Sequence, residues 1–408
     1  MKLLSVVVYS SHSQISGSKE VNINTFSISP SAPNSNGDRY VSMVFDNAYT
    51  LDPNASIRVM LPILPVAEIN QFTIKVKSYV EGQTAAYLYS NTQPSGRDNS
   101  LDRNELGYAP VDITASGSTS YTDQIDGHYL VRTPLEFSFM TNEISNGTIA
   151  NNAYIDILCD INMSGYPITA IKNTSFYGTL DGHGYTISNL AINSVINGVD
   201  YSCALFGCVS TPTIKNINIY RLSLNHTIDT RYNLRVGSII GYSDPQSGNL
   251  TIDNCHVSIL GINIGTMSGN IYFGGIAGDV KDANISDCEV IVNSPFSLSG
   301  NMVYFGGMVG SINMASTSIN NSRWMGSANI MSTSNTKAGG MIGNKAKGNL
   351  SVQSCEVSSE LTISSNGSNN YYGSMIGFYN QGSSIVDTTS NHLSFVVNSS
   401  PVATHFGN

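Results

Sequence analysis

The sequence predicts an all-β protein whose larger part is a parallel β-helix of about seven coils, each about 33 residues long. A glycine-bounded apolar motif recurs five times, at 237–241, 274–278, 306–310, 339–343 and 373–377. An Ile-x-x-Cys-x-Val motif recurs in phase with it, and its fourth position holds Cys255, Cys288, Ser322, Cys355 and Thr388. Two motifs on one fixed period are typical of stacked repeats, in which each unit packs on its neighbours.

Each repeat has room for three short strands: the glycine-bounded segment, the Ile-x-x-Cys-x-Val segment and an extended stretch such as 295–299. We expect the strands to pair with the coils above and below, at roughly 4.8 Å per layer. The Cys, Ser and Thr residues then form an inward ladder, and the glycines lie at bends where a Cβ would clash. Ser322 and Trp324 depart from the motif and predict a local bulge.

The remaining chain lacks this period. Residues 1–130 contain strand-like runs at 2–9, 21–28, 40–45, 56–64 and 71–79, separated by turn-forming segments. These runs predict an antiparallel β-sandwich or jelly-roll-like anchoring domain, with a connector over 92–127. The β-helix is expected over 131–395 and a cap or tail over 396–408. We expect the first domain and residues 389–408 to cover the two ends, because open strand edges invite edge-to-edge growth.

Composition narrows the classes of partner. The chain has 19 basic and 28 acidic residues without a basic stripe, which argues against a nucleic-acid partner. Three of six cysteines share one repeat position, which favours buried thiols over a disulfide framework. The N-terminal apolar run is short and lacks a small-residue cleavage site, so we expect a first strand rather than a signal peptide. The sequence predicts no membrane span.

One segment carries a family resemblance. Phe176-Tyr-Gly-Thr-Leu-Asp-Gly-His-Gly-Tyr-Thr-Ile-Ser-Asn-Leu190, followed by Ala204-Leu-Phe-Gly207, resembles the opening of GLUG-motif repeat proteins. That family is similar to pectin-lyase-like, right-handed parallel β-helices. The resemblance covers about 134–395 and implies a right-handed parallel β-helix. Both binding proteins and enzymes are built on that fold.

Asp181 and His183 form the most enzyme-like string, Asp-Gly-His-Gly. A Gly-His-Gly triplet also occurs in β-helical polygalacturonases, which need further carboxylates on adjacent coils. No Asp-Asp pair precedes the triplet at a suitable spacing, and no Arg-x-Lys follows it. We interpret the string as a structural turn and keep His183 and Asp181 as candidate catalytic residues.

Two further sets of side chains are candidates for binding. Asp279, Asp282 and Asp287, with Glu289 nearby, offer several oxygens of the kind that Ca²⁺ prefers, but they straddle two strands and a turn, so we interpret them as a solvated rim and keep a Ca²⁺ site as the alternative. Aromatic residues recur just before the glycine motif, and they predict a strip that binds sugar or protein or stacks along the coil wall. The strip comprises Tyr272, Tyr304, Tyr371 and Tyr372.

These observations predict a non-enzymatic structural or attachment protein that projects from a virion, with the β-helix as shaft or receptor-binding surface. A bacterial cell-surface adhesin of the GLUG type is the alternative, and a polysaccharide lyase or glycosidase on this scaffold is the second alternative. The expected partners are other virion or cell-surface proteins through residues 1–130, and host-surface glycans. A homotrimer is compatible with a projecting shaft, although the sequence has no heptad cue; no cofactor is predicted.

Overall fold

A computed structural model describes residues 124–408 except 126, 229–230, 245–248, 314–315, 381–383, 389 and 408, together with the backbone of six earlier strands. The chain divides into two compact units, Met1–Asp123 and Gln124–Asn408. In the first unit four strands form an antiparallel sheet in the order β4-β1-β5-β6, and β2 pairs antiparallel with β3. These strands are β1 (Lys2–Ser10), β2 (Lys19–Asn22), β3 (Ser27–Pro30), β4 (Tyr40–Thr50), β5 (Gln71–Tyr79) and β6 (Ala86–Pro94).

The single strand expected over 21–28 is wrong, because β2 and β3 are separate strands that pair antiparallel with each other. The run at 56–64 and most of the connector at 92–127 lie outside the described residues. The antiparallel pairing expected for this part of the chain is confirmed for the described strands.

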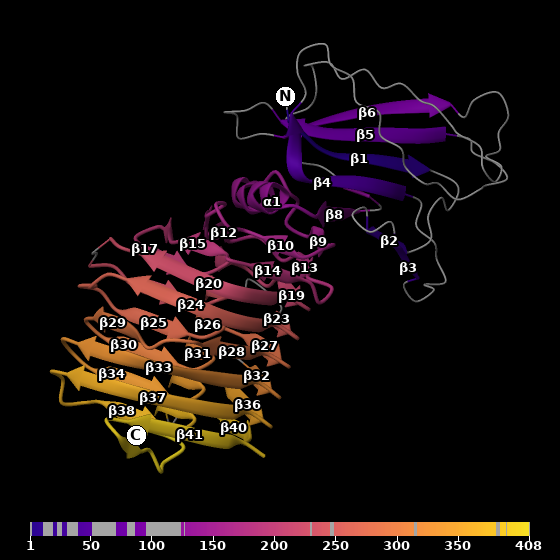
Figure 1. Cartoon of the computed structure of the whole chain (residues 1–408). Helices are drawn as coiled ribbons and strands as arrows, with labels where there is room; N and C mark the ends of the chain where they lie inside the picture. Colours follow the sequence, from indigo (N-terminus) through magenta and orange to yellow (C-terminus); the bar gives the residue numbers. More distant parts are fainter. Residues whose placement is uncertain are drawn as a thin grey trace. The chain divides into compact units, whose positions relative to one another are not determined.

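The second unit is a parallel β-solenoid of about six turns, stacked from α1 to the C-terminal strands (Figure 1). Four sheets run along the stack. Sheet 1 contains β7 (Gln124–Ile125), β8 (His128–Val131), β9 (Tyr154–Ile157), β13 (Thr179–Asp181), β19 (Thr213–Lys215), β23 (Leu250–Asp253), β27 (Ala283–Ser286), β32 (Thr317–Asn320), β36 (Asn349–Gln353) and β40 (Ser384–Asp387).

Sheet 2 contains β10 (Ile161–Asn162), β11 (Ile168–Thr169), β14 (Thr186–Ser188), β15 (Ala191–Asn193), β20 (Asn218–His226), β24 (His256–Ile264), β28 (Glu289–Val292), β29 (Phe296–Gly300), β33 (Arg323–Ser332), β37 (Glu356–Ser365), β41 (His392–Val397) and β42 (Ser400–Pro401). Sheet 3 contains β16 (Val195–Asn197), β17 (Asp200–Cys203), β21 (Leu234–Val236), β25 (Ile271–Gly274), β30 (Val303–Gly306), β34 (Thr336–Gly339) and β38 (Tyr371–Gly373). Sheet 4 contains β12 (Ile171–Asn173), β18 (Phe206–Val209), β22 (Ile240–Ser243), β26 (Ala277–Val280), β31 (Val309–Ile312), β35 (Ile342–Lys345) and β39 (Ile376–Tyr379).

One turn visits the four sheets in order, for example β27, then β28 and β29, then β30, then β31. The expected three strands per coil are therefore wrong, since both sequence motifs contain a corner. Gly306–Gly310 joins β30 to β31, and Cys288 lies between β27 and β28. The expected seven coils become about six, because residues 134–146 form a helix at the first end of the stack.

The glycine corners are required by close backbone approach. A Cβ on Gly306 would lie 1.9 Å from Val309 O, and one on Gly307 would lie 2.0 Å from Gly340 O. Gly307 also faces Trp324, whose Cγ would be 2.6 Å from that Cβ. Trp324 is fully buried and contacts Phe305 edge-on at 6.0 Å. The expected bulge is wrong, because β33 pairs with β37 without a register shift: the glycine corner makes room for the indole.

Equivalent apolar residues stack through the core. Sheet 1 aligns one fully buried residue from each of seven neighbouring strands: Ile155, Leu180, Ile214, Ile252, Ile285, Ile319 and Val352. The predicted ladder is confirmed for Cys255, Cys288, Ser322 and Cys355, which are all buried, and the cysteines are free thiols. Its last member is wrong. Asn391, not Thr388, continues the ladder, since Asn391 Oδ1 accepts from Cys355 N and the register shifts between β36 and β40.

The helix α1 (Pro134–Asn146), which the repeat pattern did not predict, contacts β8, β11 and β12 at the first end of the solenoid (Figure 1). Thr133 caps it by accepting from Glu136 N at 3.1 Å, and Gly147 ends it in the left-handed conformation. At the other end, residues 404–407 hydrogen-bond to the backbone of the last glycine corner. None of the described helices is long and apolar enough to cross a membrane.

Candidate functional site

The candidate catalytic residues Asp181 and His183 lie on the outer side of sheet 1, in its first turns. Asp156 on β9 pairs in register with Asp181 on β13, so two carboxylates occupy adjacent turns. His183 has a φ of 50° and turns back over them, with Nε2 at 2.6 Å from Asp156 Oδ1. His128 on β8 contacts the other oxygen, with Nδ1 at 2.6 Å from Asp156 Oδ2. We call these four residues the His–Asp cluster.

The cluster is electrostatically compensated around Asp181. Lys215 Nζ lies 3.0 Å from Asp181 Oδ2, and the Tyr154 hydroxyl donates to the same oxygen at 3.2 Å. Burial raises the pKa of Asp181, but hydrogen bonds from Asn216, the His183 amide and Lys215 outweigh burial and lower it to about 2. Asp181 is therefore an ionised, hydrogen-bonded carboxylate near neutral pH and not a proton donor.

The structure contains the turn that the sequence predicted for Asp-Gly-His-Gly. It also places Asp156 beside His183, which the sequence did not predict. The His183 amide donates to Asp181 Oδ1 at 3.0 Å, which closes the turn. Asp156 and His128 were missed because they lie in a first turn outside both repeated motifs. Parallel register with Asp181 is the signal that would have found Asp156.

The four tyrosines of the predicted strip are half-buried. Tyr272, Tyr304 and Tyr371 share one column of sheet 3, in which Lys337 separates the last two. Tyr272 and Tyr304 stack with ring centroids 4.5 Å apart, and burial raises the pKa of both hydroxyls. Tyr372 pairs with Ala338 and belongs to the neighbouring column. The four rings therefore do not form one continuous strip.

The three aspartates kept as candidates for Ca²⁺ do not come together. Asp279 is buried on β26 and accepts from Arg235 Nε at 3.2 Å, whereas Asp287 lies at the corner after β27 and accepts from Asn321. Asp282 lies in the turn between those strands. Burial raises the pKa of Asp279 to about 6 although Arg235 opposes the shift. Among the described residues, the group of carboxylates and imidazoles that could share an ion is Asp156, Asp181 and His183.

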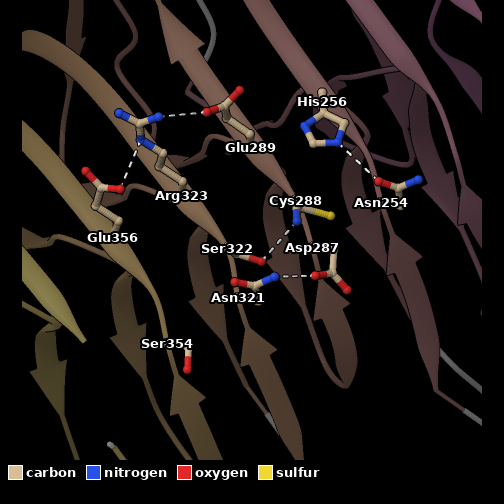
Figure 2. Close-up of a pocket in the computed structure, with 10 residues that line it drawn as sticks. All are labelled: Asn254, His256, Asp287, Cys288, Glu289, Asn321, Ser322, Arg323, Ser354 and Glu356. Carbon is tan, nitrogen blue, oxygen red and sulfur yellow. Dashed lines mark hydrogen bonds and ion pairs between the residues drawn. The ribbon is translucent and has the colours of Figure 1, made fainter. Parts of the chain in front are cut away.

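A further site lies along the corner between sheets 1 and 2, which we call the corner groove (Figure 2). It is open to solvent and has a volume of about 400 Å³. Its lining consists of Asn254, His256, Asp287, Cys288, Glu289, Asn321, Ser322, Arg323, Ser354 and Glu356.

Two polar ladders form the groove. Asn254, Asp287, Asn321 and Ser354 have φ values of 49°, 51°, 45° and 52° at the corner of four successive turns. Asn and Asp tolerate this left-handed conformation better than most residues. The sequence signal was available, since each of these residues immediately precedes the Cys or Ser of the repeat motif.

The second ladder is the first outward position of sheet 2. In register it holds His256, Glu289, Arg323, Glu356 and His392. Figure 2 shows Arg323 between Glu289 and Glu356, with Nη1 at 3.1 Å from Glu289 Oε1 and Nε at 3.3 Å from Glu356 Oε2. The groove thus alternates donors and acceptors along the stack, and its charged groups remain accessible to water.

No protein-family model matches the chain. A segment of 114 residues, 28% of the chain, is 31% identical to halomucin of Haloquadratum walsbyi and covers 1% of that protein. Among solved structures, an IgA1 protease gives a TM-score of 0.31 at 12% identity, over 96% of this chain and 29% of that one. The chain therefore spans a small part of either protein, and the parallel β-solenoid rests on its own strand pairing.

Proposed function

We propose that this chain is a non-enzymatic structural attachment protein in which the solenoid is a shaft and the corner groove binds glycans. The observation that carries the proposal is repetition: successive turns present a polar residue at the same left-handed corner position and a charged or imidazole side chain at the same outward position. A repeated ladder suits an extended, repeating ligand, whereas catalysis needs one converging set of groups.

The chemistry of the groove supports a hydroxyl-rich ligand. Amide, carboxylate, imidazole and guanidinium groups offer both donors and acceptors to sugar hydroxyls. Arg323 and its two carboxylate partners are 30–51% exposed, so a ligand can exchange with their ion pairs at modest cost.

The proposed location is a virion surface, with residues 1–130 anchoring the shaft to other virion proteins. A bacterial cell-surface adhesin of the GLUG type is the alternative. In support of the GLUG resemblance, the apolar positions Phe176, Leu180, Ile187 and Leu190 are all buried. The partial match to halomucin is compatible with a structural or surface role. Immunogold labelling of particles and cells separates the two locations.

A glycan array tests the binding proposal. We expect Arg323→Gln to weaken glycan binding at least tenfold, about 1.4 kcal/mol, because the groove loses its central charged donor. Lys347→Gln is the matched control, since Lys347 is an exposed cation at another face of the turn. Tyr304→Ala separates the tyrosine strip from the groove. Equal binding by the parent chain and Arg323→Gln would refute the groove as the site.

A polysaccharide lyase or glycosidase is the second candidate, favoured by the two carboxylates beside His183. Polyuronides and neutral polysaccharides are incubated with the chain, and new reducing ends or absorbance at about 235 nm are followed. Turnover that disappears in His183→Asn would establish the enzyme and contradict the non-enzymatic proposal.

A further inference from the structure

The His–Asp cluster brings metal-ligating atoms from separate segments of the chain to one place. One ligand atom from each of Asp156, Asp181 and His183 lies within 4.8 Å of the others. His183 Nε2 is 2.6 Å from Asp156 Oδ1, and His183 Nδ1 is 3.9 Å from Asp181 Oδ1. Sheet register fixes the two carboxylates, and the closed turn after Asp181 fixes the imidazole.

We propose that Asp156, Asp181 and His183 form a binding site for a divalent transition-metal ion of the Zn²⁺ class. Two carboxylate oxygens and one imidazole nitrogen are a ligand set that Zn²⁺ accepts, at about 2.0–2.2 Å, with a fourth position left for water. Ca²⁺ is disfavoured because it requires six to eight oxygen ligands.

Burial and access both fit an ion at this position. The Asp156 and Asp181 side chains are 8% and 5% exposed, whereas His183 is 43% exposed. The carboxylates are thus held in the wall of sheet 1, and the imidazole side is open to solvent. An ion can approach from that side and keep one water ligand.

Neighbouring groups orient the proposed ligands. His128 Nδ1 engages Asp156 Oδ2 at 2.6 Å, which directs Oδ1 toward His183. Lys215 and Tyr154 hold Asp181 Oδ2, so Oδ1 is the oxygen on the His183 side; it also accepts from Asn216 and the His183 amide. Partners of this kind typically change metal affinity by about 10–100-fold when removed.

Zn²⁺ titration of the untagged, chelator-treated full chain tests the site. Calorimetry should show that the parent chain binds one Zn²⁺ ion at this site. Asp156→Asn and His183→Asn should each weaken the affinity for that ion at least tenfold. Asn is chosen at 183 because it tolerates the left-handed backbone and removes the imidazole. Co²⁺ should give visible d–d absorption in the parent chain that both variants lack. His128→Ala should weaken binding without abolishing it.

His256→Ala is the control, because it removes an exposed imidazole from the corner groove and should leave the titration unchanged. Circular dichroism establishes that each variant is folded. A folded parent chain that binds no Zn²⁺, or Zn²⁺ binding that is identical in His183→Asn, would overturn the proposal. Glycan binding measured with excess chelator keeps this outcome separate from that of the attachment proposal.

Discussion

Lys345 is a charged residue in a column of sheet 4 that holds Val280 and Ile312 in the two preceding turns. It lies on sheet 4 in register with Ile312 of the preceding turn, and its side chain is fully buried. Its Nζ donates to the Lys347 carbonyl, and burial lowers the pKa of its ammonium group to about 8. A buried ammonium ion costs stability unless its partners compensate for lost hydration.

Lys345→Met should therefore stabilise the chain at pH 7, by about 1–3 kcal/mol in the free energy of unfolding. The ammonium group is harder to charge in the folded state, where its pKa is about 8 against an ordinary value of 10.5. The destabilisation that the buried ammonium group causes is therefore complete below pH 8, and it disappears as the pH rises from 8 through 10.5. Urea unfolding at several pH values checks this, with exposed Lys347→Met as the control. A stability gain independent of pH would contradict the assignment.

Gly307 and Gly261 offer a matched pair for the glycine corners. Gly307→Ala should destabilise the solenoid by about 1–3 kcal/mol, because the new methyl would meet Gly340 O and Trp324. Gly261→Ala should be neutral or stabilising, because no atom of the described residues lies within 4 Å of its added Cβ. Thermal unfolding of both variants is the measurement, and equal melting temperatures would refute the close approach.

At the scale of the element, α1 shows why one part of the solenoid escaped prediction. Its signals are local, a Thr-Pro-x-Glu start at Thr133 and a glycine stop at Gly147, and they occur once in the first turn. The repeats were recognised because each motif recurs. A single helix inside a β-rich chain has no such recurrence, although its capping residues can be recognised in the sequence.

The N-cap of α1 should contribute measurably to the free energy of unfolding. Thr133→Ala should lower the free energy of unfolding by about 1 kcal/mol, because Glu136 N loses the side-chain oxygen that accepts from it. Thr133→Ser keeps a hydroxyl and should retain most of the stability. If Ser and Ala at this position are equally destabilising, packing of the Thr methyl rather than capping holds the helix start.

At the scale of the whole molecule, periodicity made the stack predictable and left the His–Asp cluster hidden. The core ladders, the Cys ladder and the glycine bends all follow from residues that recur at one spacing. Asp156 and His128 lie outside both repeated motifs, and only parallel register brings Asp156 beside Asp181. The corners inside both motifs were also hidden, because a short apolar run does not reveal where the backbone bends.

The last turn should protect the stack from edge-to-edge association. β41 pairs with β37, and residues 404–407 hydrogen-bond to the final glycine corner. Deleting 389–408 therefore exposes unpaired strand edges, and we expect concentration-dependent aggregation in light scattering. A truncated chain that stays monodisperse and folded would show that these residues are dispensable as a cap.

Glycan binding and glycan turnover measured together on the same ligands test the attachment account most directly. The account predicts that the intact chain retains an extended glycan unchanged, and that Arg323→Gln releases it while Lys347→Gln does not. Cleavage of the retained glycan by the parent chain, or retention that Arg323→Gln leaves intact, would contradict a non-enzymatic shaft that binds through its corner groove.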